Sequence, residues 1–122
     1  NTDVRTVLVD PDTPTTLYAG THGGAGVYKS IDAGNNWTAV AGIGLTNTST
    51  HSLAMEDSST LYVGNPKGLF YSTDDGATWI DITDMLPAFT PGGNNHRSII
   101  IDPQDDDNIY IATQSGGVYK RD

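Results

Sequence analysis

An eight-residue sequence of the form Ser-x-Asp-x-Gly-x-x-Trp occurs twice in this chain. It reads SIDAGNNW at residues 30–37 and STDDGATW at residues 72–79, and both copies match at all four fixed positions. A sequence that returns after about 20–50 residues indicates a fold built by repetition of one structural unit. The two copies are called the first and second octets below.

Three copies of a larger unit surround the octets. Each copy begins with an apolar run, an acidic turn and a second apolar run, a pattern that predicts a β-hairpin. The second runs contain Tyr18, Tyr62 and Tyr110, which recur at about the length of one propeller blade. A shorter apolar run then predicts a third strand, and the residues after each octet predict a fourth. Because no segment has a sustained helical period, the sequence predicts an all-β protein of four-stranded antiparallel meanders, as in β-propeller blades.

Each fixed position of the octet has an expected structural role. The aspartate is expected to accept hydrogen bonds from backbone N–H groups two or three residues further on, and the serine hydroxyl lies near the same turn. The glycine permits a positive φ, and the tryptophan ring covers the sheet against the neighbouring unit. A Ca²⁺ loop is the alternative, but an EF-hand needs more oxygen ligands than the octet offers. The residues with these structural roles are Ser30, Asp32, Gly34, Trp37, Ser72, Asp74, Gly76 and Trp79.

The octets, together with the strands around them, resemble the Asp-box (BNR) repeat. This repeat is found in the β-propellers of sialidases, xyloglucanase-type glycoside hydrolases, sortilin-like receptors and photosystem assembly factors. The resemblance implies a propeller fold in which the box is a stabilising turn away from the ligand face. It also implies an extracellular or periplasmic location. Since enzymes, receptors and assembly factors all carry the repeat, it does not by itself select an activity.

The repeats divide the chain into two predicted blades and part of a third. The first blade is expected at about 4–40, the second at about 51–83 and the partial third at about 96–122, where the sequence stops before a third octet. Propellers close a ring of roughly 4 to 8 blades, so the outer faces of these units need a cover. We expect either a fragment of a larger propeller, which is slightly favoured, or a homo-oligomer that completes the ring.

Charge and composition narrow the function classes. The net charge of −9 argues against binding to nucleic acid or to an anionic membrane surface, because both need basic protein surface. The chain has no cysteine and no apolar run of about 20 residues. The run DPQDDDN at 102–108 is expected to be a solvated turn, and the three histidines lack ligand spacing. We therefore predict no cofactor and no metal site.

The candidate ligand site lies at the blade end that carries the long loops, because binding residues concentrate on such loops. Strand alternation places twelve of the fifteen acidic residues at the opposite end. Arg5, His51 and Arg97 occupy equivalent positions just ahead of the three innermost strands, so they are expected to surround a central channel, with His96 beside them. The alternative is that the repeated position serves packing or solubility.

Two function classes remain open. A glycosidase needs paired carboxylates beside the bound sugar, and the long-loop end offers only Asp84 and Asp81. We therefore expect a binding or structural scaffold for a glycan or protein ligand that is non-catalytic as isolated. The alternative is a fragment of a secreted glycoside hydrolase, sialidase-like or xyloglucanase-like, whose catalytic residues lie largely in other blades.

Overall fold

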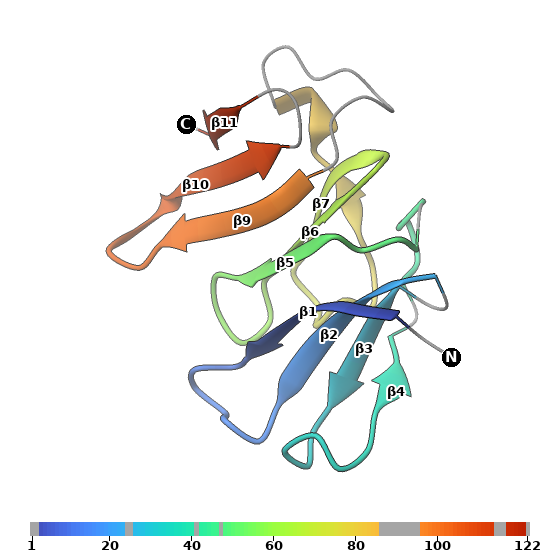
Figure 1. The fold of residues 1–122 in the computed structure, drawn as a ribbon. Coiled ribbons are helices and arrows are strands. Elements are labelled where there is room, and N and C mark those ends of the chain that lie inside the picture. The colour runs from blue at the N-terminus through green and yellow to red at the C-terminus, as the bar shows by residue number, and fades with distance from the viewer. Residues whose placement is uncertain are drawn as a thin grey trace.

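The fold is all-β, as the sequence predicts (Figure 1). The structure is a computed structural model that describes residues 3–23, 26–40, 42–46, 48–85, 96–113 and 117–121. Within these ranges the chain forms three antiparallel sheets and a single 3-10 turn, Thr83–Met85. None of the helical structure described is long and apolar enough to cross a bilayer.

The first two sheets are four-stranded meanders, and the third contains three described strands. Neighbouring strands are antiparallel and follow one another in the chain, so short turns join most of them. The first sheet contains β1 (Asp3–Val9), β2 (Leu17–His22), β3 (Val27–Ser30) and β4 (Thr38–Ala39). The second contains β5 (Ser52–Met55), β6 (Leu61–Asn65), β7 (Gly68–Ser72) and β8 (Ile80–Asp81). The third contains β9 (His96–Asp102), β10 (Asp105–Thr113) and β11 (Val118–Arg121).

The three repeated tyrosines occupy the same register in their sheets. Each pairs with one residue on the first strand and one on the third strand, and we call these three residues a tyrosine row. Because directly paired residues share one face of a sheet, each row defines one face of its sheet. The rows are Leu8, Tyr18 and Lys29 in the first sheet, Ala54, Tyr62 and Tyr71 in the second, and Ile100, Tyr110 and Lys120 in the third.

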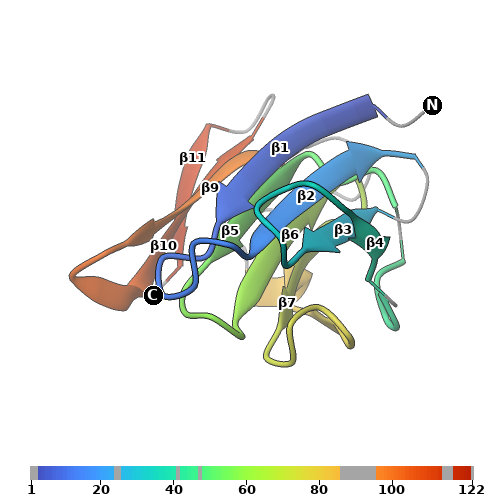
Figure 2. The same ribbon diagram turned by 90° about the horizontal axis from the view of Figure 1, so that it is seen from below.

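The second sheet lies between the other two and is covered on both faces. Leu61 and Val63 of β6 belong to the cluster shared with the first sheet, whereas Tyr62 between them belongs to the cluster shared with the third. This division follows from the two-residue period of a strand. The innermost strands β1, β5 and β9 are neighbours, and Figure 2 shows them side by side where the sheets converge. Sheets that pack face to face with their first strands innermost form consecutive propeller blades.

The two octet tryptophans differ in burial because only one of them faces another described sheet. Trp79 is 5% exposed, in the cluster between the first and second sheets. Trp37 is 39% exposed and lines an apolar groove of about 410 Å³ on the outer face of the first sheet, with Val7 and Tyr28 among its neighbours. Trp79 therefore packs between two described sheets, whereas no described sheet covers Trp37.

Candidate functional site

The serine and glycine of each octet close the turn between the third and fourth strands. The serine Oγ donates a hydrogen bond to the aspartate Oδ1, at 2.8 Å in the first octet and 2.7 Å in the second. The same Oγ accepts the glycine N–H at 2.9 Å in both copies. The glycines have φ of 89° and 84°, and the residues before them, Ala33 and Asp75, have φ of 57° and 60°. Each turn thus contains two consecutive residues in the left-handed region.

The octet aspartates accept backbone hydrogen bonds from the residue four positions further on, not two or three as expected. Asp32 Oδ1 accepts the N–H of Asn36, and Asp74 Oδ1 accepts the N–H of Thr78, both at 2.8 Å. The two left-handed residues lie between each aspartate and this donor. The second oxygen, Oδ2, accepts the side chain of that same residue. These bonds hold the pKa of both carboxyls below the ordinary range, with the side chains of Asn36 and Thr78 as the main causes.

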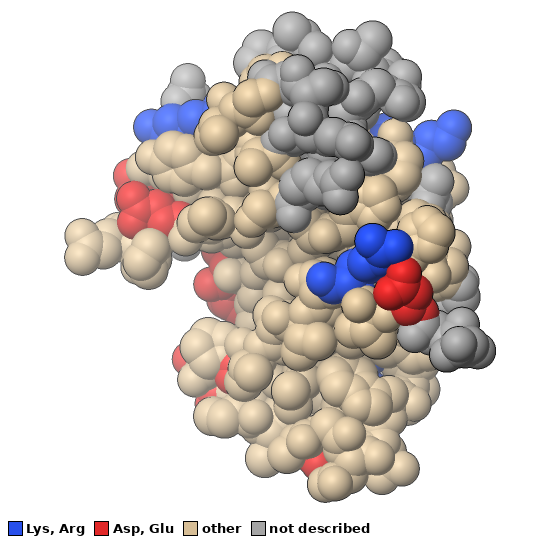
Figure 3. All heavy atoms as spheres, viewed as in Figure 1, with Lys and Arg blue, Asp and Glu red and all other residues tan. Residues whose placement is uncertain are grey.

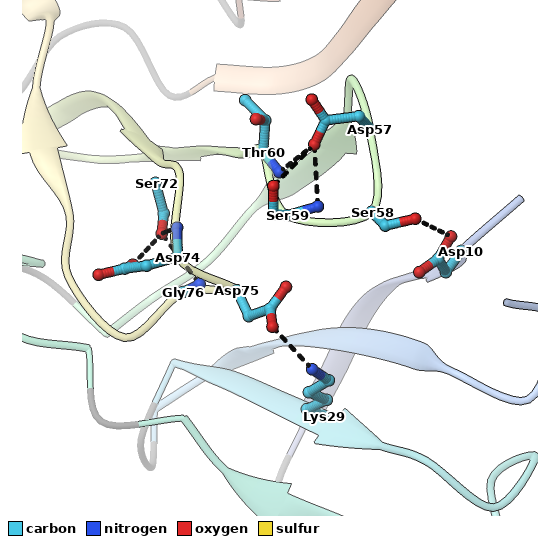
Figure 4. A network of polar contacts seen from close by, with 10 residues as sticks. All are labelled: Asp10, Lys29, Asp57, Ser58, Ser59, Thr60, Ser72, Asp74, Asp75 and Gly76. Carbon is cyan, nitrogen blue, oxygen red and sulfur yellow. Dashed lines mark hydrogen bonds and ion pairs between the residues drawn. The ribbon is translucent and has the colours of Figure 1, made fainter. Parts of the chain in front are cut away.

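Polar contacts join the second octet to the first sheet and link the β1–β2 turn to the β5–β6 turn (Figure 4). Ser58, in the β5–β6 turn, donates to Asp10 Oδ1 at 3.1 Å and to Asp12 Oδ2 at 3.0 Å, both in the β1–β2 turn. Asp75 of the second octet pairs with Lys29 of the first sheet, with 3.4 Å between Oδ2 and Nζ. Figure 3 shows the acidic side chains along the edge of the molecule where the β1–β2, β5–β6 and β9–β10 turns lie.

At the opposite end of the first two sheets, two histidines lie together. The rings of His22 and His51 are stacked, with centroids 6.2 Å apart and planes 17° apart. The backbone fixes this pair: Thr50 N donates to Thr21 O at 2.8 Å, and each histidine follows one of these threonines in the chain. The pair therefore joins the end of β2 to the segment that leads into β5.

The structure describes two of the four predicted site side chains. His51 lies beside His22, which is not one of the four predicted site residues. Arg5 forms an exposed ion pair with Asp3, with 2.7 Å between Nη2 and Oδ2. The side chains of His96 and Arg97 lie outside the described residues. Strand alternation could place His22 at this end, but only the bond between Thr21 and Thr50 brings it against His51.

The two carboxylates that the sequence offers for glycosidase chemistry, Asp81 and Asp84, lie at and in the 3-10 turn. Asp81 Oδ1 accepts the N–H of Thr83 at 2.9 Å, so it caps the 3-10 turn. Asp84 lies in that turn and is exposed. In the predicted acidic turn, Asp102 Oδ1 accepts the N–H of Gln104 at 2.9 Å. Among the residues that the structure describes, no group of three or more His, Asp or Glu side chains is placed to hold a metal ion.

Comparison with known proteins places this architecture among β-propellers. No family model matches the chain. A probable oligoxyloglucan-reducing end-specific xyloglucanase from Neosartorya fischeri is 37% identical over 95 residues, which are 70% of this chain and 11% of that protein. The chain therefore spans about a tenth of the length of this relative.

Solved structures extend the likeness to nearly the whole chain. An ancestral GH74 enzyme has a TM-score of 0.75 at 24% identity, over 91% of this chain and 13% of its own. The Niastella koreensis GH74 enzyme has a TM-score of 0.72 at 26% identity, over 97% and 21%. YCF48 bound to D1 peptide has a TM-score of 0.67 at 19% identity, over 97% and 36%. These proteins are β-propellers, so the three packed sheets are propeller blades.

Proposed function

We propose that this chain is a segment of an Asp-box β-propeller that acts as a binding or structural scaffold and is non-catalytic in isolation. The main support is the hydrogen bonding of the octet aspartates. Both oxygens of Asp32 and of Asp74 accept bonds from their own turn. A carboxylate used in this way stabilises the corner between two strands, as the Asp-box resemblance implies.

The ligand site of this proposal is the blade end that carries His22 and His51. Imidazoles donate and accept hydrogen bonds, so they suit the hydroxyl groups of a sugar. Arg5 belongs to the site, and Arg97 and His96 join it through their place at the start of β9. The net charge of −9 favours a neutral ligand over an anionic one. We therefore propose a neutral glycan as the ligand.

A second candidate function is participation in a secreted xyloglucanase-type glycoside hydrolase. The observation that favours it is the 37% identity to the xyloglucanase from Neosartorya fischeri. A glycosidase needs two carboxyl groups about 5–9.5 Å apart across the scissile bond. Asp81 is already engaged by Thr83, so in this alternative the catalytic pair lies largely in other blades.

Binding and hydrolysis of xyloglucan oligosaccharides test the proposals together. We expect the chain to bind them in a calorimetric titration without releasing new reducing ends. His51→Ala should weaken binding at least about tenfold, which corresponds to the loss of about 1.4 kcal/mol. Gln104→Ala, in the acidic turn at the other end, is the matched control and should bind as the wild type does.

Three results would change the proposed function. Release of reducing ends by this chain alone would favour the hydrolase. Equal affinity in the His51→Ala and wild-type proteins would remove the proposed site. Failure to bind any member of a glycan array that includes xyloglucan fragments and sialosides would leave a purely structural role or a protein ligand.

A further inference from the structure

A cavity opens among the three acidic turns, at the end of the molecule opposite to the histidine pair. The β1–β2, β5–β6 and β9–β10 turns lie on the same side there (Figures 1 and 2). The cavity has a volume of about 400 Å³, which is within the range of small-ligand pockets. The first turn contributes Pro11 to its lining, the second strand end Met55 and Glu56. The β9–β10 hairpin contributes Ile101 and Asp102, so all three units form the wall.

The apolar part of the wall is held in place by the hydrophobic clusters. Met55 is partly buried against the cluster between the first and second sheets. Ile101 is partly buried against the cluster between the second and third. The turns themselves are joined by Ser58, whose hydroxyl donates to Asp10 at 3.1 Å and to Asp12 at 3.0 Å. The β1–β2 and β5–β6 sides of the cavity are therefore fixed relative to each other before any ligand binds.

Two half-buried carboxylates face this cavity, and the protein holds each through one oxygen. Glu56 Oε2 accepts the hydroxyl of Tyr62 at 2.7 Å. Asp102 Oδ1 accepts the N–H of Gln104 at 2.9 Å. Within the described part of the chain, the second oxygen of each carboxylate accepts no hydrogen bond, and no lysine or arginine pairs with either group. The cavity thus combines apolar walls with two acidic groups that have no counter-charge among these residues.

We propose that this cavity binds an arginine side chain of a basic peptide segment. The guanidinium contacts the remaining oxygens of Glu56 and Asp102, and the methylene stem packs against Met55 and Ile101. Arginine suits the cavity better than lysine does, because its planar fork presents five N–H donors and is more weakly hydrated than an ammonium group. The net charge of −9 attracts such a segment toward the acidic end. This inference is independent of the proposed glycan site, which lies at the other end of the blades.

The test is an NMR titration of the chain with a capped glycine pentapeptide that carries one central arginine. We expect saturable shifts of the methyl signals of Met55 and Ile101. A peptide with citrulline in place of arginine has nearly the same shape without the charge, and it should bind at least about tenfold more weakly. The corresponding lysine peptide should also bind more weakly than the arginine peptide.

Two conservative variants test the carboxylates. Glu56→Gln and Asp102→Asn keep an oxygen that can accept the bond from Tyr62 or from Gln104. Each should weaken binding of the arginine peptide roughly threefold to tenfold. Asp107→Asn is the matched control, because it removes the same charge from an exposed position on the same hairpin, outside the cavity lining. Its affinity should stay within about twofold of the wild type. Circular dichroism and thermal melting confirm that each variant is folded.

Several outcomes would overturn the proposal. Methyl signals of Met55 and Ile101 that do not move at about 10 mM arginine peptide would show that the cavity does not bind it. Equal affinities for the arginine and citrulline peptides would remove the charged contact, and equal affinities for arginine and lysine would remove the preference for a guanidinium. A loss in Asp107→Asn as large as that in Glu56→Gln would show a diffuse attraction to the acidic end. None of these results bears on the glycan proposal, whose test uses a different ligand and His51→Ala.

Discussion

At the residue scale, each octet is a turn held by one serine hydroxyl and one carboxylate. The serine accepts the glycine N–H, and the carboxylate accepts the N–H four residues after itself. Two consecutive left-handed residues make this geometry accessible, and the second of them is glycine in both copies. The aspartates therefore stabilise the chain reversal. The fixed spacing of serine, aspartate and glycine in the octet allows the serine hydroxyl to bond both the aspartate carboxylate and the glycine N–H.

The two octet glycines should differ in their tolerance of a methyl group. A Cβ on Gly34 would have only the Trp37 ring near it, at 3.8 Å, whereas one on Gly76 would meet Val40 Cγ1 at 3.1 Å and the Trp79 ring at 3.2 Å. Both substitutions force alanine into a positive φ, which costs roughly 1–2 kcal/mol. Gly76→Ala adds overpacking of roughly 1–3 kcal/mol. Urea unfolding should show the larger loss for Gly76→Ala, and equal losses would contradict the packing between the first two sheets.

Acid should destabilise the fold through the octet carboxylates. Their pKa is lower in the folded chain than the ordinary value of 3.8, so below this value the unfolded chain binds more protons. The stabilisation is present above the ordinary value and is lost as the pH falls through the folded one. In the second octet, Thr78→Val removes the hydroxyl donor to Asp74, so the folded pKa of Asp74 rises toward the ordinary value and the loss of stability in acid should become smaller. The measurement is the free energy of unfolding of the wild type and of Thr78→Val between about pH 5 and pH 3. The same pH dependence in both proteins would show that the Thr78 hydroxyl does not lower the pKa of Asp74.

At the element scale, burial on one or both faces distinguishes the sheets. β6 is apolar on both faces because it has a sheet on each side, and Leu61, Tyr62 and Val63 divide between two clusters. β1 has a covered face with Leu8 and an outer face with exposed Val7 and Val9. The apolar groove lined by Val7 and Trp37 lies on that outer face.

Fluorescence of single-tryptophan variants measures the difference in solvent exposure between Trp37 and Trp79. Trp79→Phe leaves Trp37, whose emission should be red-shifted and readily quenched by acrylamide because the ring lines the open groove. Trp37→Phe leaves Trp79, which should be blue-shifted and protected because it lies between two sheets. Equal quenching of the two proteins would contradict the sheet order. Protection of Trp37 that increases with protein concentration would show that the outer face becomes covered by association.

At the scale of the whole molecule, the sequence could predict what repeats but not how neighbouring repeats touch. The recurrence of Tyr18, Tyr62 and Tyr110 predicts β-hairpins, because local alternation decides strand formation. The His22–His51 stack depends on a bond between a strand and the linker to the next sheet, and no periodicity encodes such a contact. For the same reason the octet positions alone could not show that one tryptophan would be buried and the other exposed.

The central claim is that the second sheet lies between the first and third as the middle one of three consecutive blades. Nuclear Overhauser contacts in solution test this order directly. We expect cross-peaks from the Tyr62 ring to the methyl groups of Ile109 and Ile111, and from the Tyr18 ring to those of Leu61 and Val63. Cross-peaks from the Tyr18 ring to Ile109 or Ile111, with none from Tyr62, would contradict the account.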